Sequence, residues 1–179
     1  QAVSRGLGDV YKRQELVRES IKSKNNERQI QGILEGFFLE KGARGPAYNS
    51  IVASGDNACI LHYTSNNSPL NKGELLLVDA GCSLTDYYNG DITRTIPIGG
   101  KFSDEQKVIY EIVLSAQKTA IQSAIIGSNS STVHNVALTI LVEGLKEIGL
   151  LSGSTEEIIE NQSYKHLYMH RTCLLYTSP

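Results

Sequence analysis

The stretch LLLVDAGCSLTDYYNGDITRTIPI, residues 75–98, decides the fold of the chain. Its opening apolar run is too short for a helix and suits a buried strand, and it ends at the carboxylate of Asp79. A second run over residues 91–98 is rich in Ile and Thr and opens with the carboxylate of Asp91. Four turn and loop formers lie between the runs, namely Gly81, Asp86, Asn89 and Gly90. The pattern predicts a β-hairpin in which the two acids face each other across the ladder.

Two chemical interpretations of the Asp79 and Asp91 pair are open at this point. Two ionised carboxylates that approach closely repel each other unless a cation lies between them, and a hard divalent metal ion is the natural partner. The alternative is ordinary turn chemistry, because an aspartate at a strand end commonly accepts hydrogen bonds from neighbouring backbone amides. Spacing alone favours turn chemistry.

Length and composition bound the class of protein. A chain of 179 residues with 40% hydrophobic content fits one globular domain with a core. The net charge of -2 indicates no nucleic-acid partner and no membrane-binding basic patch, and no apolar run approaches the length of a membrane span. The cysteines Cys59, Cys82 and Cys173 are odd in number and lack metal-type spacing, which indicates reduced thiols in a cytoplasmic protein. We expect Cys59 and Cys82 to fill the core.

A first helix is expected over residues 26–40. Its apolar face is formed by Ile30, Ile33, Leu34, Phe37 and Phe38. Asn26 with Gln29 resembles a capping box, and Gly42 is placed to end the helix.

Three further helices are expected in the second half of the chain. Ser103 with Gln106 forms a capping box that opens a long helix, whose expected buried stripe is Val108, Ile109, Ile112, Val113 and Ala116. A second long helix is expected over residues 131–148, with an apolar face of Val136, Ala137, Ile140, Leu141 and Leu145. A short helix is expected over residues 155–161.

A second hairpin is predicted over residues 50–63. Two short apolar runs, residues 50–53 and 59–63, are separated by the turn string Gly55, Asp56 and Asn57. This hairpin would deliver His62 near a strand end. A histidine in such a place is more often a core or edge residue than a catalytic one.

The motifs in these segments resemble those of a known family. Asp-Ala-Gly from Asp79, followed by Gly-Asp-Ile-Thr-Arg-Thr up to residue 95, resembles the metal-binding hairpin of the pita-bread metallopeptidases. That family includes methionine aminopeptidase, aminopeptidase P and prolidase, and the match to aminopeptidase P is closest. The string NACILHY around His62 resembles the segment whose histidine contacts substrate there. The string YMHRT around His170 resembles a strand that carries a further active-site histidine.

The resemblance implies a fold and an activity. The expected fold class is α+β, a partial pita-bread (creatinase/aminopeptidase) fold in which helices cover a curved antiparallel sheet. The implied activity is metal-dependent removal of the N-terminal residue from Xaa-Pro peptides, so the implied partner is a peptide with proline at its second position. Two divalent ions, with manganese expected, would be held in part by Asp79 and by a bridging Asp91. His62 and His170 would orient the substrate, and the intact parent could be a homo-oligomer.

The chain also departs from the family pattern. The family uses two aspartates, one histidine and two glutamates as metal ligands, and this chain matches only Asp79 and Asp91, so we expect it to be inactive by itself. The loop between these aspartates is one residue longer than in aminopeptidase P. The match suggests a partial catalytic domain over residues 15–172, with a non-native leader at residues 1–14 and a non-native tail at residues 173–179.

Three alternatives stay open from the sequence. A prolidase-type Xaa-Pro dipeptidase would share both aspartates. A non-catalytic pita-bread module that binds peptides would keep the fold, but it would have no need for both acids, so the joint presence of Asp79, Asp91, His62 and His170 argues against it. A chain that is only a piece of the fold would expose a sheet edge and apolar helix faces and would aggregate readily.

Overall fold

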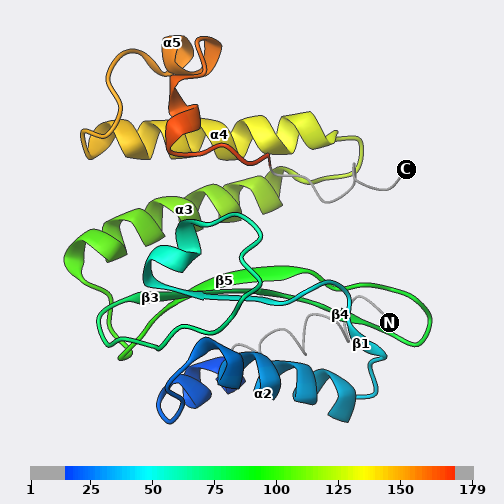
Figure 1. Ribbon diagram of the computed structural model, residues 1–179. Helices are drawn as coiled ribbons and strands as arrows, with labels where there is room; N and C mark the ends of the chain where they lie inside the picture. Colours follow the sequence, from blue (N-terminus) through cyan, green and yellow to red (C-terminus); the bar gives the residue numbers. More distant parts are fainter. Residues whose placement is uncertain (1–14, 172–179) are drawn as a thin grey trace. The chain divides into compact units, whose positions relative to one another are not determined.

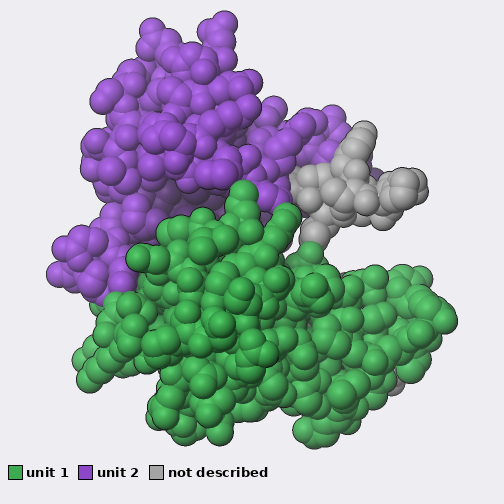
Figure 2. All heavy atoms as spheres, viewed as in Figure 1, with its two compact units in different colours: residues 1–102 green, residues 103–179 purple. Residues whose placement is uncertain are grey.

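The structure is a computed structural model that describes residues 15–171. It divides into two compact units, residues 1–102 and residues 103–179, which are coloured separately in Figure 2. Each unit is described by itself. Helices and antiparallel sheets make up the chain, so the predicted α+β class is confirmed. The expected non-native leader (residues 1–14) and tail (residues 173–179) lie outside the described residues, and residues 15–21 are helical.

Unit 1 combines one long helix with two small sheets. The helix α2 spans Glu27–Glu40, and the short 3-10 helix η1 spans Gly55–Cys59. The strands are β1 (Gly45–Pro46), β2 (Ile51–Ser54), β3 (Leu75–Ala80), β4 (Cys82–Ser83) and β5 (Ile92–Pro97). One antiparallel sheet has the order β2-β3-β5, and the other pairs β1 with β4. Among the described strands, β2 and β5 each pair with β3 alone, so both are edges.

The predicted central hairpin is confirmed, but the expectation that Asp79 and Asp91 face each other across its ladder is wrong, because Asp91 lies just before β5. Strand β3 pairs with β5 in antiparallel register, with Asp79 opposite Thr93 and Ala80 opposite Ile92. Burial alternates along β3 because successive side chains of a strand point to opposite faces. Leu76, Val78 and Ala80 are buried on one face, and Asp79 therefore lies on the other face.

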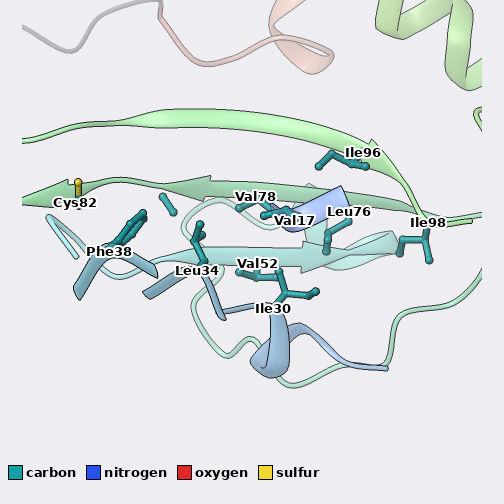
Figure 3. Close-up of a cluster of buried hydrophobic side chains, with 11 residues drawn as sticks. Val17, Ile30, Leu34, Phe38, Val52, Leu76, Val78, Cys82, Ile96 and Ile98 are labelled. Carbon is teal, nitrogen blue, oxygen red and sulfur yellow. The ribbon is translucent and has the colours of Figure 1, made fainter. Parts of the chain in front are cut away.

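The buried face of β3 joins the core of unit 1. Helix α2 packs against the sheet, and Figure 3 shows Ile30, Leu34 and Phe38 pointing at Val52 and the buried strand residues. The three α2 side chains are at most 3% exposed, so truncating Ile30, Leu34 or Phe38 to alanine would cost about 2–5 kcal/mol. This core covers one face of β3, and Asp79 lies on the opposite face.

The ends of α2 agree closely with the prediction. The Asn26 side chain accepts a hydrogen bond from the Gln29 amide at 3.0 Å, and Gly42 follows the helix with a left-handed φ of 84°. The Gln29 side chain reaches the amide of Asn25, at 2.9 Å, instead of the amide of Asn26. The reciprocal half of the capping box is therefore displaced by one residue.

The predicted second hairpin is wrong. Strand β2 pairs with β3, with Ile51 opposite Asp79, and residues 55–59 form η1 instead of a tight turn. Residues 60–63 belong to no strand. The reason is that side-chain hydrogen bonds from Asn57 and Tyr63 to a buried glutamate hold this segment, so a strand ladder is not needed. Cys59 is exposed and is not core filler, whereas Cys82 is buried as predicted.

Unit 2 is helical. It contains α3 (Asp104–Ser123), α4 (Ser130–Glu147), α5 (Thr155–Glu160) and the 3-10 helix η2 (Ser163–His166), and Figure 1 shows α3 beside α4. All three predicted helices are confirmed, including the capping box at Ser103. A second cluster of buried apolar residues joins α4 to α5 and consists of Leu138, Val142, Leu145, Leu151 and Ile158. No helix in residues 15–171 is both long enough and apolar enough to cross a membrane.

The predicted buried stripe of α3 is largely wrong. Val108, Ile109 and Val113 are 44%, 39% and 51% exposed, whereas Ala116 is buried. Ile112 faces α4, because a Cβ atom placed on Gly144 of α4 would lie 2.6 Å from the Ile112 side chain. The absence of a side chain at Gly144 thus makes room for Ile112, whereas Val108, Ile109 and Val113 remain exposed. On α4 the prediction fares better, because Ala137, Leu141 and Leu145 are buried.

Candidate metal centre

The structure brings Asp79 and Asp91 together through a tyrosine. The Tyr48 hydroxyl oxygen lies 2.6 Å from Asp79 Oδ1 and 2.8 Å from Asp91 Oδ1. Asp79 sits near the end of β3, and Asp91 directly precedes β5 on the partner side of the hairpin. A hydroxyl carries one proton, so it can donate to only one of the two carboxylates at a time. The pair therefore has unused acceptor capacity and two like charges in one place.

Gly81 allows the strands to approach at this point. A Cβ atom placed on Gly81 would lie 1.6 Å from the carbonyl oxygen of Gly90 and 3.0 Å from the amide nitrogen of Asp91. The amide of Gly90 also donates to the carbonyl oxygen of Cys82 at 2.9 Å. The sequence marks Gly81 as a turn former, but its structural role is to let the backbone before Asp91 pass close by.

The electrostatics of the pair favour a bound cation. Burial raises the pKa of Tyr48 far above its usual range, and the hydrogen bonds and charges of Asp79 and Asp91 raise it further, so the hydroxyl stays neutral. Partial burial of the Asp91 carboxyl raises its pKa, the hydrogen bond from Tyr48 opposes this, and the Asp79 charge adds to the rise. A cation beside both carboxylates would relieve this repulsion.

The donor set fits a hard divalent ion in part. Two carboxylates are oxygen ligands of the kind that Mn²⁺, Mg²⁺ and Ca²⁺ bind. Within residues 15–171, no group of three or more His, Cys, Asp or Glu side chains lies close enough to hold a metal. Asp79 and Asp91 would thus be the ligands contributed by the described part of the chain. Sequence reasoning missed Tyr48, since nothing in its local sequence indicates contact with residues more than thirty positions away.

His62 lies on the exposed segment that follows η1. Its φ of 56° is left-handed, which is uncommon for a residue other than glycine. The expectation that it lies at a strand end is therefore wrong, and its expected contact with substrate stays a prediction.

His170 lies in unit 2 on a segment without regular structure. Residues 163–166 form η2 and residues 167–171 form no strand, so the resemblance to a strand is not borne out there. The His170 ring is exposed, and its Nδ1 lies 2.8 Å from the carbonyl oxygen of Arg171. A strand needs a neighbour to pair with, and every described strand belongs to unit 1.

The segment that contains His170 lines an open cavity of about 500 Å³ within unit 2. Its walls include Tyr168, Arg171 and the buried His134, whose ring stacks on Tyr168 at 6.3 Å. Burial lowers the pKa of His134, and the charge of Arg171 lowers it further. His134 is therefore neutral at pH 7. The sequence predicts no functional role for it.

Comparison with known proteins places this geometry in context. The family model described as metallopeptidase family M24 matches residues 9–177. An Xaa-Pro aminopeptidase of Haemophilus influenzae is 48% identical over 144 residues, which are 80% of this chain and 33% of that protein. An Xaa-Pro aminopeptidase of Escherichia coli is 41% identical over 144 residues, 80% of this chain and 32% of that protein. The chain thus spans about a third of the length of the curated relatives it matches.

Solved structures are similar to the chain as well. The aminopeptidase PepP of Pseudomonas aeruginosa superposes with a TM-score of 0.81 at 41% identity, over 89% of this chain and 37% of that one. A variant of Escherichia coli aminopeptidase P in complex with substrate superposes with a TM-score of 0.78 at 40% identity, over 82% of this chain and 33% of that one. The expected similarity to the aminopeptidase P fold is confirmed over these residues.

Proposed function

Given that this chain belongs to metallopeptidase family M24, we propose that Asp79 and Asp91 serve in the metal centre of an Xaa-Pro aminopeptidase. One observation carries the proposal: the carboxylates of Asp79 in β3 and of Asp91 just before β5 converge on a single hydroxyl, that of Tyr48. Turn chemistry alone does not require this convergence, because neither contact of Tyr48 involves a backbone amide. The Xaa-Pro aminopeptidases among the relatives support the reaction class.

The roles of the chain's own residues follow from their positions. Asp79 and Asp91 would hold divalent ions, and Tyr48 would keep both carboxylates oriented toward them. Bound divalent ions would supply Lewis-acid chemistry that polarises the scissile carbonyl and makes water a nucleophile at neutral pH. His62 and His170 would orient a peptide whose second residue is proline. We further propose manganese as the metal, the cytoplasm as the compartment and residues 15–172 as the extent of native catalytic-domain sequence.

Titration with Mn²⁺ tests the metal centre directly. We expect calorimetry to detect Mn²⁺ binding to the wild-type chain, and the dissociation constant to rise at least about tenfold in Asp79→Asn and Asp91→Asn, since each change removes one of two carboxylate ligands. Asp86→Asn is the matched control, because Asp86 is an exposed acid in the same hairpin loop. Equal binding by all three variants and the wild type would contradict the proposed centre.

The reaction class is tested on the source nucleic acid. Residues 173–179 fall outside the proposed native sequence, so the native reading frame has to be read from the source beyond the codon for Thr172. We expect that native frame to encode a histidine within a few residues and, later, two glutamates in strand-like contexts. These would supply the remaining ligands of the family's centre. A native frame without them would contradict the aminopeptidase proposal and favour a peptide-binding module.

A further inference from the structure

Glu27 is a buried carboxylate that the proposed chemistry does not use. It is the first residue of α2 and is 0% exposed. Its two oxygens accept five hydrogen bonds, all between 2.8 and 3.0 Å, from Ser54 N, Ser54 Oγ, Asn57 Nδ2, Tyr63 Oη and Ser68 N. The donors belong to one segment, residues 54–68, that lies outside α2 and contains His62.

The carboxylate and this segment depend on each other. A buried charge is costly unless it is fully hydrogen-bonded, and here the donors occupy both oxygens of Glu27. Burial by itself raises the pKa of Glu27, but hydrogen bonds from Asn57, from the amides of Ser54 and Ser68 and from Tyr63 outweigh it, and the pKa is lowered. Glu27 is therefore ionised at neutral pH. Its place in the first turn of α2 also suits a negative charge.

A second buried anchor holds the same segment. Asn66 is 1% exposed, accepts a hydrogen bond from the Val52 amide at 2.9 Å and donates to the Ser50 carbonyl oxygen at 2.7 Å. Its amide also donates to Gln31 Oε1 on α2 at 3.0 Å. Through Asn66 the segment is thus attached to both α2 and β2.

The tip of the segment, residues 60–62, is exposed, in contrast to the buried anchors on either side of it. Ile60 and Leu61 are 55% and 63% exposed, and His62 is exposed as well. A left-handed residue other than glycine costs about 1 kcal/mol and persists where its surroundings hold it. Asn57 before His62 and Tyr63 directly after it are both bound to Glu27. The anchors lie on either side of the strained residue.

We propose that Glu27 is a positioning residue that fixes the backbone around His62 through Asn57 and Tyr63. Its carboxylate touches no reacting atom in this role. It sets the direction in which the exposed tip presents His62 to a peptide. The inference rests on the proposed substrate contact of His62, but the anchoring itself can be measured independently of that contact.

Two variants test the anchoring by amide hydrogen exchange and by the NMR signals of the His62 ring. Glu27→Gln replaces one acceptor oxygen with an amide group that faces N–H donors, and Tyr63→Phe removes only the hydroxyl that holds the residue next to His62. Both should shift the His62 ring signals, and Glu27→Gln should speed exchange over residues 55–68 by about tenfold or more while the β3–β5 pair stays protected. Glu40→Gln is the matched control, since Glu40 is an exposed glutamate of the same helix.

The inference would be overturned if amide exchange is unchanged in Glu27→Gln and the His62 ring signals are unchanged in Tyr63→Phe. If Glu27→Gln does not fold, the His62 signals of Tyr63→Phe alone decide. A titration of the chain with alanyl-proline in the presence of Mg²⁺ separates the two proposals, since diamagnetic Mg²⁺ leaves the His62 ring signals observable whereas paramagnetic Mn²⁺ would broaden them. Failure of the wild-type His62 signals to respond would count against the proposed function, and the exchange data would still decide the anchoring. A wild-type response that is equally strong in both variants would show that the anchoring does not serve substrate contact.

Discussion

The two candidate histidines stand in very different surroundings. His62 lies on a segment whose flanking residues bind a buried carboxylate in unit 1, so its unusual backbone conformation is held in place. His170 lies on an irregular segment of unit 2, and the contact recorded for its ring is with the carbonyl oxygen of the next residue. The two sequence motifs thus led to one histidine whose neighbours are held by buried hydrogen bonds and to another for which residues 15–171 show no such support. A motif identifies the side chain, and the tertiary contacts of its neighbours determine whether it is held in place.

The same contrast separates the two units as a whole. Unit 1 holds its chemistry-bearing residues with buried polar groups, among them Glu27, Asn66 and the half-buried Tyr48. Unit 2 relies on apolar packing between α4 and α5 and on close approach of α3 to α4. Polar networks are intolerant of a missing member, whereas apolar helix packing accepts many substitutions. Mutations at the polar anchors of unit 1 should therefore have larger effects than conservative apolar substitutions in the helices of unit 2.

The largest effect is expected from Gly81→Ala. The added Cβ would meet the Gly90 carbonyl oxygen at 1.6 Å, which is backbone and cannot rotate away. We expect a loss of at least about 3 kcal/mol in the free energy of unfolding, measured by urea denaturation, together with loss of Mn²⁺ binding. Gly36→Ala in α2, where nothing lies within 4 Å, should instead stabilise by about 0.5–1 kcal/mol. Similar stability of the two variants would contradict the close-approach role.

An intermediate, pH-dependent effect is expected from Glu27→Gln. The lowered pKa of Glu27 means that its contribution to stability is fully present above the pKa of the unfolded chain and is lost as pH falls through the lower folded value. Glutamine has no such dependence. The wild type should therefore exceed Glu27→Gln by about 2 kcal/mol at pH 7, and the gap should narrow below about pH 4.5. Denaturant melts at a series of pH values measure this gap, and a gap that stays constant with pH would contradict this view of the network.

The smallest effect is expected from replacing each histidine with glycine. His62→Gly removes a left-handed strain of about 1 kcal/mol, offset in part by the greater freedom of glycine when unfolded, so we expect a net gain of about 0.5 kcal/mol. His170→Gly removes no such strain and should be neutral or slightly destabilising. Thermal melts of both variants compare the two sites. A gain at His170 and none at His62 would reverse the contrast between the two units.

Local patterns in the sequence were sufficient for much of the fold. The hairpin of β3 and β5, the caps of α2 and α3, and the extents of α4 and α5 all follow from periodicity, capping residues and glycines near one another in the chain. The stripe of α3 was misassigned because periodicity identifies an apolar face without specifying what covers it. The segment with His62 was misassigned because its apolar run suggested a strand while its polar residues had distant partners.

By itself, the sequence predicted the hairpin that carries Asp79 and Asp91, because strand pairing across one hairpin is a local consequence of alternation and turn residues. Only the tertiary structure decided what stands beside them and what holds His62. Tyr48 reaches the two acids from 31 and 43 positions away, and Glu27 binds donors that lie 27 to 41 positions further along the chain. Such contacts depend on how the chain folds back on itself, and buried polar groups find their partners only once packing has excluded water.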